Sequence, residues 1–188
     1  MTLLVLELKV PPTDADLPHA LAERGAAIGA YVVSFVAISG YWLQHHRLFH
    51  VLARSDGWLL LLNLVLLLAI TFMPYPTAVL ADRLVAGQQV NLAVAFYGVG
   101  QLLPALAICV LFQYCRSAGL LAPAVRKDLL RSLTWLTWGS VIAYVVSIGL
   151  ALVVPVVSLM YYALSPVYWA IDGARARHEL PKPHRVKR

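Results

Sequence analysis

The sequence predicts an all-α, polytopic membrane protein with six transmembrane helices in each subunit, the first of them truncated. Hydrophobic residues make up 61% of the chain and charged residues only 13%, whereas soluble domains average roughly 45–50% and 25%. The uncharged runs are also much longer than the strands of a membrane β-barrel, which alternate over about 10 residues. Because lipid offers no hydrogen-bond partners to the backbone, such long runs are expected to be helical.

The first predicted span, residues 1–10 (MTLLVLELKV), stops at a double proline. A complete span takes about 20 apolar residues at about 1.5 Å each, so this stretch crosses only about half of the hydrocarbon. It is not expected to be a signal peptide, because it lacks a basic flank and a cleavage site and is interrupted by Glu7 and Lys9. We therefore interpret it as a partial transmembrane helix.

Five further spans are predicted at residues 25–49, 57–81, 90–115, 129–153 and 155–171. The last two share an uncharged run, residues 132–171. This run would form about 60 Å of straight helix, twice the thickness of the hydrocarbon, so it is expected to fold back on itself. Gly149 and Pro155 bracket the expected turn, because proline cannot continue the helix before it.

Lys and Arg residues are distributed unequally between the two ends of the predicted spans. One side carries Arg47, Arg54, Arg116, Arg126, Lys127, Arg131, Arg175, Arg177, Lys182, Arg185, Lys187 and Arg188. The other side carries only Lys9, Arg24 and Arg83. Since cytoplasmic loops are enriched in Lys and Arg, both termini are predicted to be cytoplasmic, which requires residues 1–10 to cross the membrane.

The domain organisation and the partners follow from this arrangement. Residues 1–172 are expected to form one multi-pass domain in the plasma membrane, followed by a basic cytoplasmic tail over residues 173–188. The net charge of +6 is interpreted as orienting charge that also contacts anionic lipid, not as a nucleic-acid surface.

Four residues gather at the predicted cytoplasmic end of the second span: His45, His46, Arg47 and His50. His46 and His50 are spaced i and i+4 and share a helix face, as a pair of metal ligands would. No acidic residue lies between them and no third ligand is evident nearby, so no metal site is predicted. We interpret the group as side chains at the mouth of a helix, with metal or proton sensing as the alternative.

Other polar and helix-breaking positions are assigned to packing. Gly98 and Gly100 in FYGVGQ (residues 96–101) are expected to allow close helix contact, not to form a potassium filter. Pro74 and Pro76 are expected to kink or end the third span. Three amides within the spans are expected to hydrogen-bond across helices: Asn63, Gln101 and Gln113. No catalytic constellation is found, so no enzyme activity and no cofactor are predicted.

Three stretches carry a resemblance: residues 2–11 (TLLVLELKVP), 34–49 (SFVAISGYWLQHHRLF) and 59–82 (LLLLNLVLLLAITFMPYPTAVLAD). Together with the paired final helices, they resemble the bacterial transmembrane protein 175-type potassium channels, relatives of the lysosomal potassium channel. The resemblance implies six spans per subunit and a homotetramer around a central pore. It further implies passive potassium conduction through a pore that the first span lines, with a hydrophobic constriction and a threonine layer instead of a carbonyl filter.

The resemblance also assigns residues to that pore. Thr2 aligns with the threonine layer, and Leu3 and Leu6 align with pore-facing leucines. The spacing of these residues places them on neighbouring faces of one helix. Glu7, an acidic residue within an apolar span, is a candidate for attracting cations at the outer mouth.

One departure from the family pattern is expected to matter. The family's signature of arginine, phenylalanine, serine and aspartate precedes residues 2–11 and is not found in this chain. We therefore expect either a start that was placed too late or a truncated first span. Two other functions stay open: a non-conducting membrane scaffold or assembly subunit, and a secondary transporter.

Overall fold

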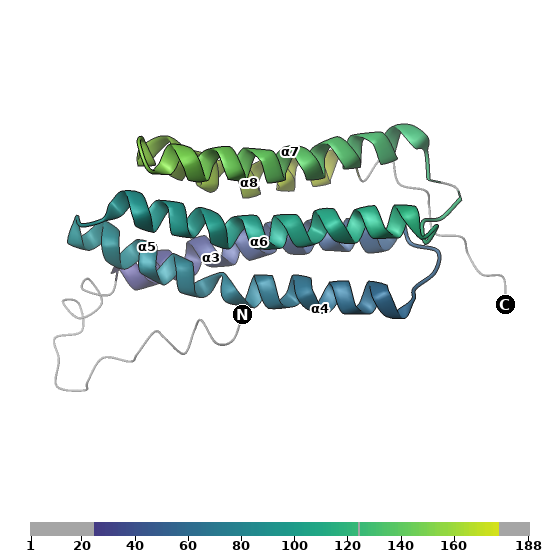
Figure 1. The fold of residues 1–188 in the computed structure, drawn as a ribbon, viewed down its shortest axis with the longest axis horizontal. Coiled ribbons are helices and arrows are strands. Elements are labelled where there is room, and N and C mark those ends of the chain that lie inside the picture. The colour runs from purple at the N-terminus through teal and green to yellow at the C-terminus, as the bar shows by residue number, and fades with distance from the viewer. Residues whose placement is uncertain (1–24, 124, 177–188) are drawn as a thin grey trace.

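The computed structural model describes residues 25–123 and 125–176, and this part of the chain is all-helical. Its helices are α3 (Gly25–His50), α4 (Gly57–Phe72), α5 (Pro74–Ala86), α6 (Val90–Ser117), α7 (Lys127–Ala151) and α8 (Pro155–Ala176). They run side by side along the long dimension of the molecule (Figure 1). Three stretches in the described part are long and apolar enough to cross a membrane: Gly57–Ala86, Val90–Ser117 and Lys127–Ala151.

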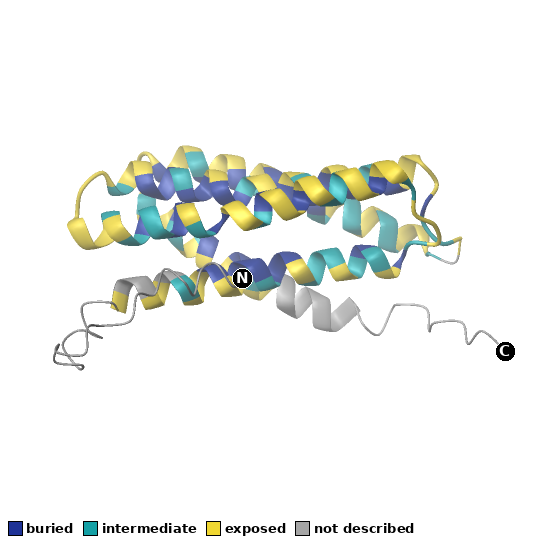
Figure 2. Ribbon diagram, turned by 90° about the horizontal axis from the view of Figure 1, so that it is seen from below, coloured by how far each residue is buried: buried dark blue, intermediate teal, exposed yellow. Residues whose placement is uncertain are grey.

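Helix α6 is the centre of this bundle, because it contacts each of the other described helices. Its most apolar stretch is 61% buried, compared with 17% for Gly57–Ala86 and 22% for α7. Figure 2 shows buried residues on the faces that helices turn toward one another and exposed residues on the outer faces. Those outer faces carry many large apolar side chains, such as Leu68, which is 71% exposed. Lipid suits such faces, whereas a soluble monomer rarely exposes apolar patches of this size.

Two glycines of α6 allow neighbouring helices to approach closely. A Cβ atom at Gly100 would lie 2.8 Å from Cγ of Pro76 in α5. A Cβ atom at Gly98 would lie 2.8 Å from Cγ1 of Ile148 in α7 and would collide with the hydroxyl of Tyr162 in α8. The prediction of close helix contact at these glycines is confirmed, and residues 96–101 lie within α6 and not in a filter loop.

The stretch Met73–Thr77 breaks one long apolar run into α4 and α5. Pro74 and Pro76 lack the amide hydrogens that would continue the helical hydrogen bonds. The hydroxyl of Thr77 instead donates to the carbonyl oxygen of Met73 at 2.9 Å. The expected effect of the two prolines is confirmed. Beyond the break, α5 packs against both α3 and α6, whereas α4 packs mainly against α6.

The chain folds back between α7 and α8 inside the interval that Gly149 and Pro155 bracket. Helix α7 ends at Ala151, and Pro155 is the first residue of α8, where its fixed φ suits a helix start. The side-chain amide nitrogen of Asn91, at the start of α6, donates to the carbonyl oxygen of Leu152 at 2.9 Å. This contact ties the turn to the central helix.

The loops at the opposite end are tied to each other by backbone hydrogen bonds. The α3–α4 loop and the α6–α7 loop form a β-bridge between Leu52 and Leu121. The amide of Ala53 donates to the carbonyl oxygen of Leu120, and the amide of Ala122 donates to that of Val51, both at 2.8 Å. We call this end of the bundle the basic end, defined by Arg47, Arg54, Arg116, Arg126, Lys127 and Arg131.

Candidate functional site

The residues predicted to line the pore, Thr2, Leu3 and Leu6, and the predicted outer acid Glu7 lie outside the described residues. The described helices nevertheless contain two polar groupings within an otherwise apolar bundle. One is a buried cluster of tyrosines at the centre of the bundle. The other is the histidine-rich end of α3.

The tyrosine cluster begins with a contact between α3 and α6. The hydroxyl of Tyr41 lies 2.7 Å from the backbone oxygen and 2.9 Å from the side-chain oxygen of Gln101. The amide nitrogen of Gln101 donates to the hydroxyl of Tyr97 at 2.7 Å. Gln101 is 1% exposed, so both ends of its amide are satisfied without water. The prediction of a cross-helix hydrogen bond is confirmed at this position.

The cluster continues into α7 and α8. The hydroxyls of Tyr41 and Tyr144 are 3.5 Å apart, and Tyr144 shares a 3.0 Å hydrogen bond with the hydroxyl of Ser165. The ring of Tyr144 contacts the rings of both Tyr161 and Tyr162, with centroids 5.3 and 6.1 Å apart. Four helices therefore meet through hydroxyl and ring contacts, most of them between buried side chains.

Nothing in this cluster forms a catalytic set. Its donors and acceptors are hydroxyls and one amide, and no acidic or basic side chain takes part in the contacts described above. In lipid, hydrogen bonds of this kind hold helices at defined positions. The cluster is therefore a structural connection between α3, α6, α7 and α8. Sequence reasoning missed it, although five of its members are tyrosines within uncharged runs.

At the histidine-rich end of α3, the rings of Trp42, His46 and His50 contact one another in order along the helix. His46 stacks on Trp42 with centroids 5.1 Å apart, and His50 meets His46 edge-on at 4.5 Å. His45 lies on another face of the helix, where its Nε2 is 2.9 Å from Oδ1 of Asn63 in α4. Among the residues that the structure describes, no group of three or more potential metal ligands occurs.

The remaining predicted polar positions differ in outcome. Arg47 is half-buried and lines a cavity of about 30 Å³ between α3, α6 and α7. The predicted cross-helix bond of Asn63 is confirmed by its contact with His45. The prediction is wrong for the amide nitrogen of Gln113, which is buried without a partner among the described residues. Gln113 is rotated by about 120° around α6 from Gln101, so it does not face the tyrosines.

A carboxylate is held at the basic end, where α4 begins. The hydroxyl of Tyr114 donates to Asp56 at 2.6 Å, and the backbone amide of Leu59 donates to its other oxygen at 2.8 Å. Both bonds favour the charged form, Tyr114 more strongly, so the pKa of Asp56 is lowered from its ordinary value. Asp56 thereby caps α4 and connects it to α6.

The chain is similar to a known protein family and to known proteins. Residues 1–74 match the model of the endosomal/lysosomal potassium channel TMEM175 family. A potassium channel of Streptomyces collinus is 34% identical over 180 residues, which cover 92% of this chain and 85% of that protein. The chain belongs to the TMEM175 family.

Further TMEM175 relatives support the assignment over shorter stretches. A potassium channel of Chamaesiphon minutus is 36% identical over 116 residues, covering 60% of this chain and 55% of that protein. The human endosomal/lysosomal proton channel TMEM175 is 36% identical over 78 residues, which cover 40% of this chain and 15% of the human protein. Ion channel function follows from membership in this family.

The fold agrees with that of a solved TMEM175 structure. The crystal structure of a lysosomal potassium-selective channel TMEM175 homologue from Chamaesiphon minutus matches with a TM-score of 0.76 and 27% identity. The match covers 92% of this chain and 89% of that one. The helical bundle around α6 is thus the bundle of a TMEM175 channel, embedded in a membrane.

Proposed function

We propose that this protein is a potassium-permeable cation channel that conducts passively as a homotetramer around a central pore. The observation that carries the proposal is the 34% identity to the Streptomyces collinus potassium channel over 85% of that protein's length. The permeant potassium ion is the proposed ligand of the pore, and no cofactor is proposed.

Each subunit is proposed to span the membrane six times. Helices α3 and α8, with 26 and 22 residues, would be about 39 and 33 Å long, enough for the roughly 30 Å of hydrocarbon. Both pack against α6, which supports their crossing the membrane beside it. The basic end is proposed to face the cytoplasm, in keeping with the positive-inside rule, with both termini on that side of the plasma membrane.

The pore is proposed to be lined by the first span through Thr2, Leu3 and Leu6. Four Thr2 hydroxyls around the axis would replace part of the hydration shell of a potassium ion, and the leucines would form a constriction that gates by dewetting. Glu7 would raise the local concentration of cations at the outer mouth. No carbonyl filter enters this scheme.

The test is the reversal potential of the full chain in proteoliposomes under opposed potassium and sodium gradients. A potassium-selective pore shifts the reversal potential toward the potassium value, up to about 59 mV per tenfold gradient. Leu6→Ala should raise the current by widening the constriction, while Leu68→Ala on the exposed face of α4 should leave it unchanged. Absence of current from correctly folded protein would favour a non-conducting assembly subunit, and current that needs a coupled ion would favour a transporter.

A further inference from the structure

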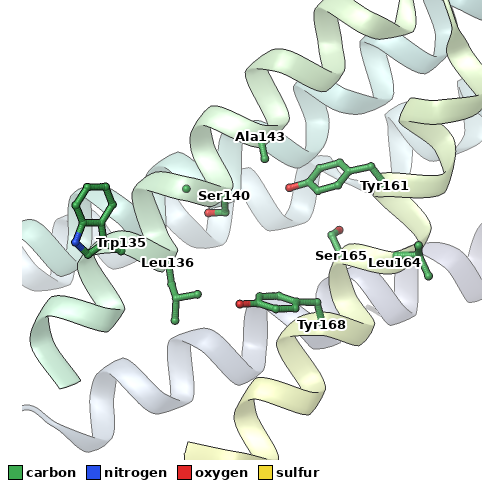
Figure 3. Close-up of a pocket in the computed structure, with 9 residues that line it drawn as sticks. Trp135, Leu136, Ser140, Ala143, Tyr161, Leu164, Ser165 and Tyr168 are labelled. Atoms are coloured by element: carbon green, nitrogen blue, oxygen red, sulfur yellow. The ribbon is translucent and has the colours of Figure 1, made fainter. Parts of the chain in front are cut away.

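A groove of about 430 Å³ opens between the outer faces of α7 and α8. Its walls are formed by Trp135, Leu136, Gly139, Ser140 and Ala143 of α7 and by Tyr161, Leu164, Ser165 and Tyr168 of α8. Figure 3 shows the hydroxyl groups of Tyr161 and Tyr168 directed from α8 toward α7 across this groove. Its volume lies in the range of about 300–1,000 Å³ that is typical of sites for small ligands.

The groove is open to the outside of the bundle, not a packing defect inside it. Trp135 is 74% exposed and Leu164 is 65% exposed. Gly139 leaves its floor open, because a Cβ atom placed there would have no neighbour within 4 Å. The lining of the groove is mainly apolar, which suits a lipid acyl chain.

Positive charges lead directly to this groove along α7. Lys127, Arg131, Trp135 and Gly139 follow one another at i, i+4 spacing and form one ridge of the helix. Arg131 therefore lies about 6 Å and Lys127 about 12 Å from Trp135 along the helix axis. Both side chains are exposed.

The acid closest in sequence, Asp128, is already engaged. Its carboxylate lies 3.3 Å from the guanidinium of Arg126, which offsets its charge in the first turn of α7. On the neighbouring helix α6, the guanidinium of Arg116 donates to the hydroxyl of Thr134 in α7 at 3.2 Å. A further cation is therefore held beside α7. On the α7 side, the approach to the groove thus carries the cations Arg126, Lys127 and Arg131 and one acid, a net positive charge.

We propose that this groove binds one anionic phospholipid, with its phosphate headgroup on Lys127 and Arg131 and one acyl chain between α7 and α8. The charge complementarity selects this occupant. A zwitterionic headgroup has no net charge to complement the two exposed cations, and an apolar helix offers them no anion. Trp135 lies at the junction, where the amphipathic indole marks the level of the headgroups. Basic pockets between transmembrane helices bind anionic headgroups in this way.

The first measurement uses the full chain in phosphatidylcholine nanodiscs that contain a minor fraction of phosphatidylglycerol with brominated acyl chains. Bromine quenches tryptophan fluorescence at contact, so a lipid in the groove quenches Trp135. The chain has 5 tryptophans, and the signal of Trp135 is obtained as the difference from Trp135→Phe. We expect stronger quenching of Trp135 by brominated phosphatidylglycerol than by the same fraction of brominated phosphatidylcholine.

Two pairs of variants separate the headgroup contact from the groove. The double variant Lys127→Gln/Arg131→Gln should weaken the preference for phosphatidylglycerol about five-fold for each cation removed. The double variant Arg54→Gln/Arg83→Gln removes the same charge elsewhere and should keep the preference. Gly139→Leu fills the groove and should abolish the specific quenching. Gly149→Leu, on the same helix with equally open space, should not.

Three results would overturn the proposal. Equal quenching by the two brominated lipids would show ordinary annular lipid at Trp135. Equal loss of preference in both charge variants would show a general surface potential instead of a site. No quenching by either lipid, with disulfide cross-linking between subunits through a cysteine introduced at Leu164, would show that a second copy of the chain covers the groove.

Discussion

Three helices approach one another closely at Gly98. This glycine lies on α6, faces Ile148 of α7 and lies directly opposite the hydroxyl of Tyr162 in α8. Tyr162 is 2% exposed, and its hydroxyl has no hydrogen-bond partner among the described residues. The absence of a side chain at position 98 is therefore what makes room for a buried polar atom.

Adding one methyl group at this position should destabilise the bundle. Gly98→Ala forces Tyr162 and Ile148 to shift, and overpacking of this kind costs about 1–3 kcal/mol. The free energy of unfolding in detergent mixtures measures the effect. Gly149→Ala is the matched control, because its Cβ meets nothing within 4 Å.

A second variant identifies the cause of that loss. Tyr162→Phe removes the colliding hydroxyl, so Gly98→Ala should cost less in the Tyr162→Phe background than in the natural protein. Equal costs at Gly98 and Gly149 would contradict the close approach described here.

At the scale of single helices, the start of α4 depends on one carboxylate. Asp56 accepts hydrogen bonds from Tyr114 and from the amide of Leu59, and its pKa lies below the ordinary value of 3.8. A depressed pKa means that the folded state favours the charged form. The resulting stabilisation is present above pH 3.8 and is lost as the pH falls through the lowered pKa.

Removing the tyrosine hydroxyl should weaken this pH dependence. Tyr114 is the largest cause of the lowered pKa, so Tyr114→Phe should reduce stability at neutral pH and make its decline on acidification shallower. The stabilities of the two proteins should converge below the folded pKa of Asp56. Unfolding curves recorded from pH 7 down to pH 3 measure this difference. Parallel curves at all pH values would contradict the link between Tyr114 and Asp56.

Helix positions were more predictable than helix packing. Uncharged runs and prolines indicated helices and a break at Met73–Thr77, and α4 and α5 do meet at Met73. The packing of α5 was not predictable, because it includes the close approach of Pro76 to Gly100 of α6, 24 residues further along the chain. Local signals report where a helix ends, whereas its next neighbour depends on tertiary packing.

At the scale of the whole molecule, the tyrosine cluster joins helices from both ends of the chain. The hydroxyl of Tyr41 contacts Gln101, which lies 60 residues further along the chain, and Tyr144, which lies 103 residues further along. Hydrogen bonds of this kind between transmembrane helices contribute about 0.6 kcal/mol on average and up to about 1.7 kcal/mol. The single hydroxyl hydrogen of Tyr41 lies within reach of two oxygens of the buried Gln101, so the contribution of Tyr41 should lie toward the upper end of that range.

Tyr41→Phe should therefore lower the free energy of unfolding by about 1–2 kcal/mol, because it also leaves the side-chain oxygen of Gln101 unpaired. Tyr75→Phe is the matched control, since Tyr75 is 60% exposed on α5. Unfolding of both variants in the same detergent series provides the measurement. A change no larger than that of the control would show that the contact between Tyr41 and Gln101 does not stabilise the bundle.

The tyrosine cluster also marks the boundary of what could be predicted. The amide of Gln101 was recognised because an amide in hydrocarbon requires a partner. Tyrosine gives no such signal, since its ring suits the core, the lipid or the interface equally well. The α7–α8 groove was missed for a related reason: its shape depends on Gly139 lying opposite Tyr161 and Tyr168, which no local pattern contains. The residues predicted for the pore remain predictions.

The central place of α6 has a consequence for biogenesis. A ribosome makes α3 before α6, so Tyr41 emerges before its partner Gln101 has been made. Tyr144 and Ser165 follow later still, and only the last helix to emerge completes the cluster. The hydroxyl of Tyr41 must therefore wait for α6, and the hydrogen bond between Tyr144 and Ser165 forms only when α8 is present. We expect a chain that stops before α8 to be retained by membrane quality control.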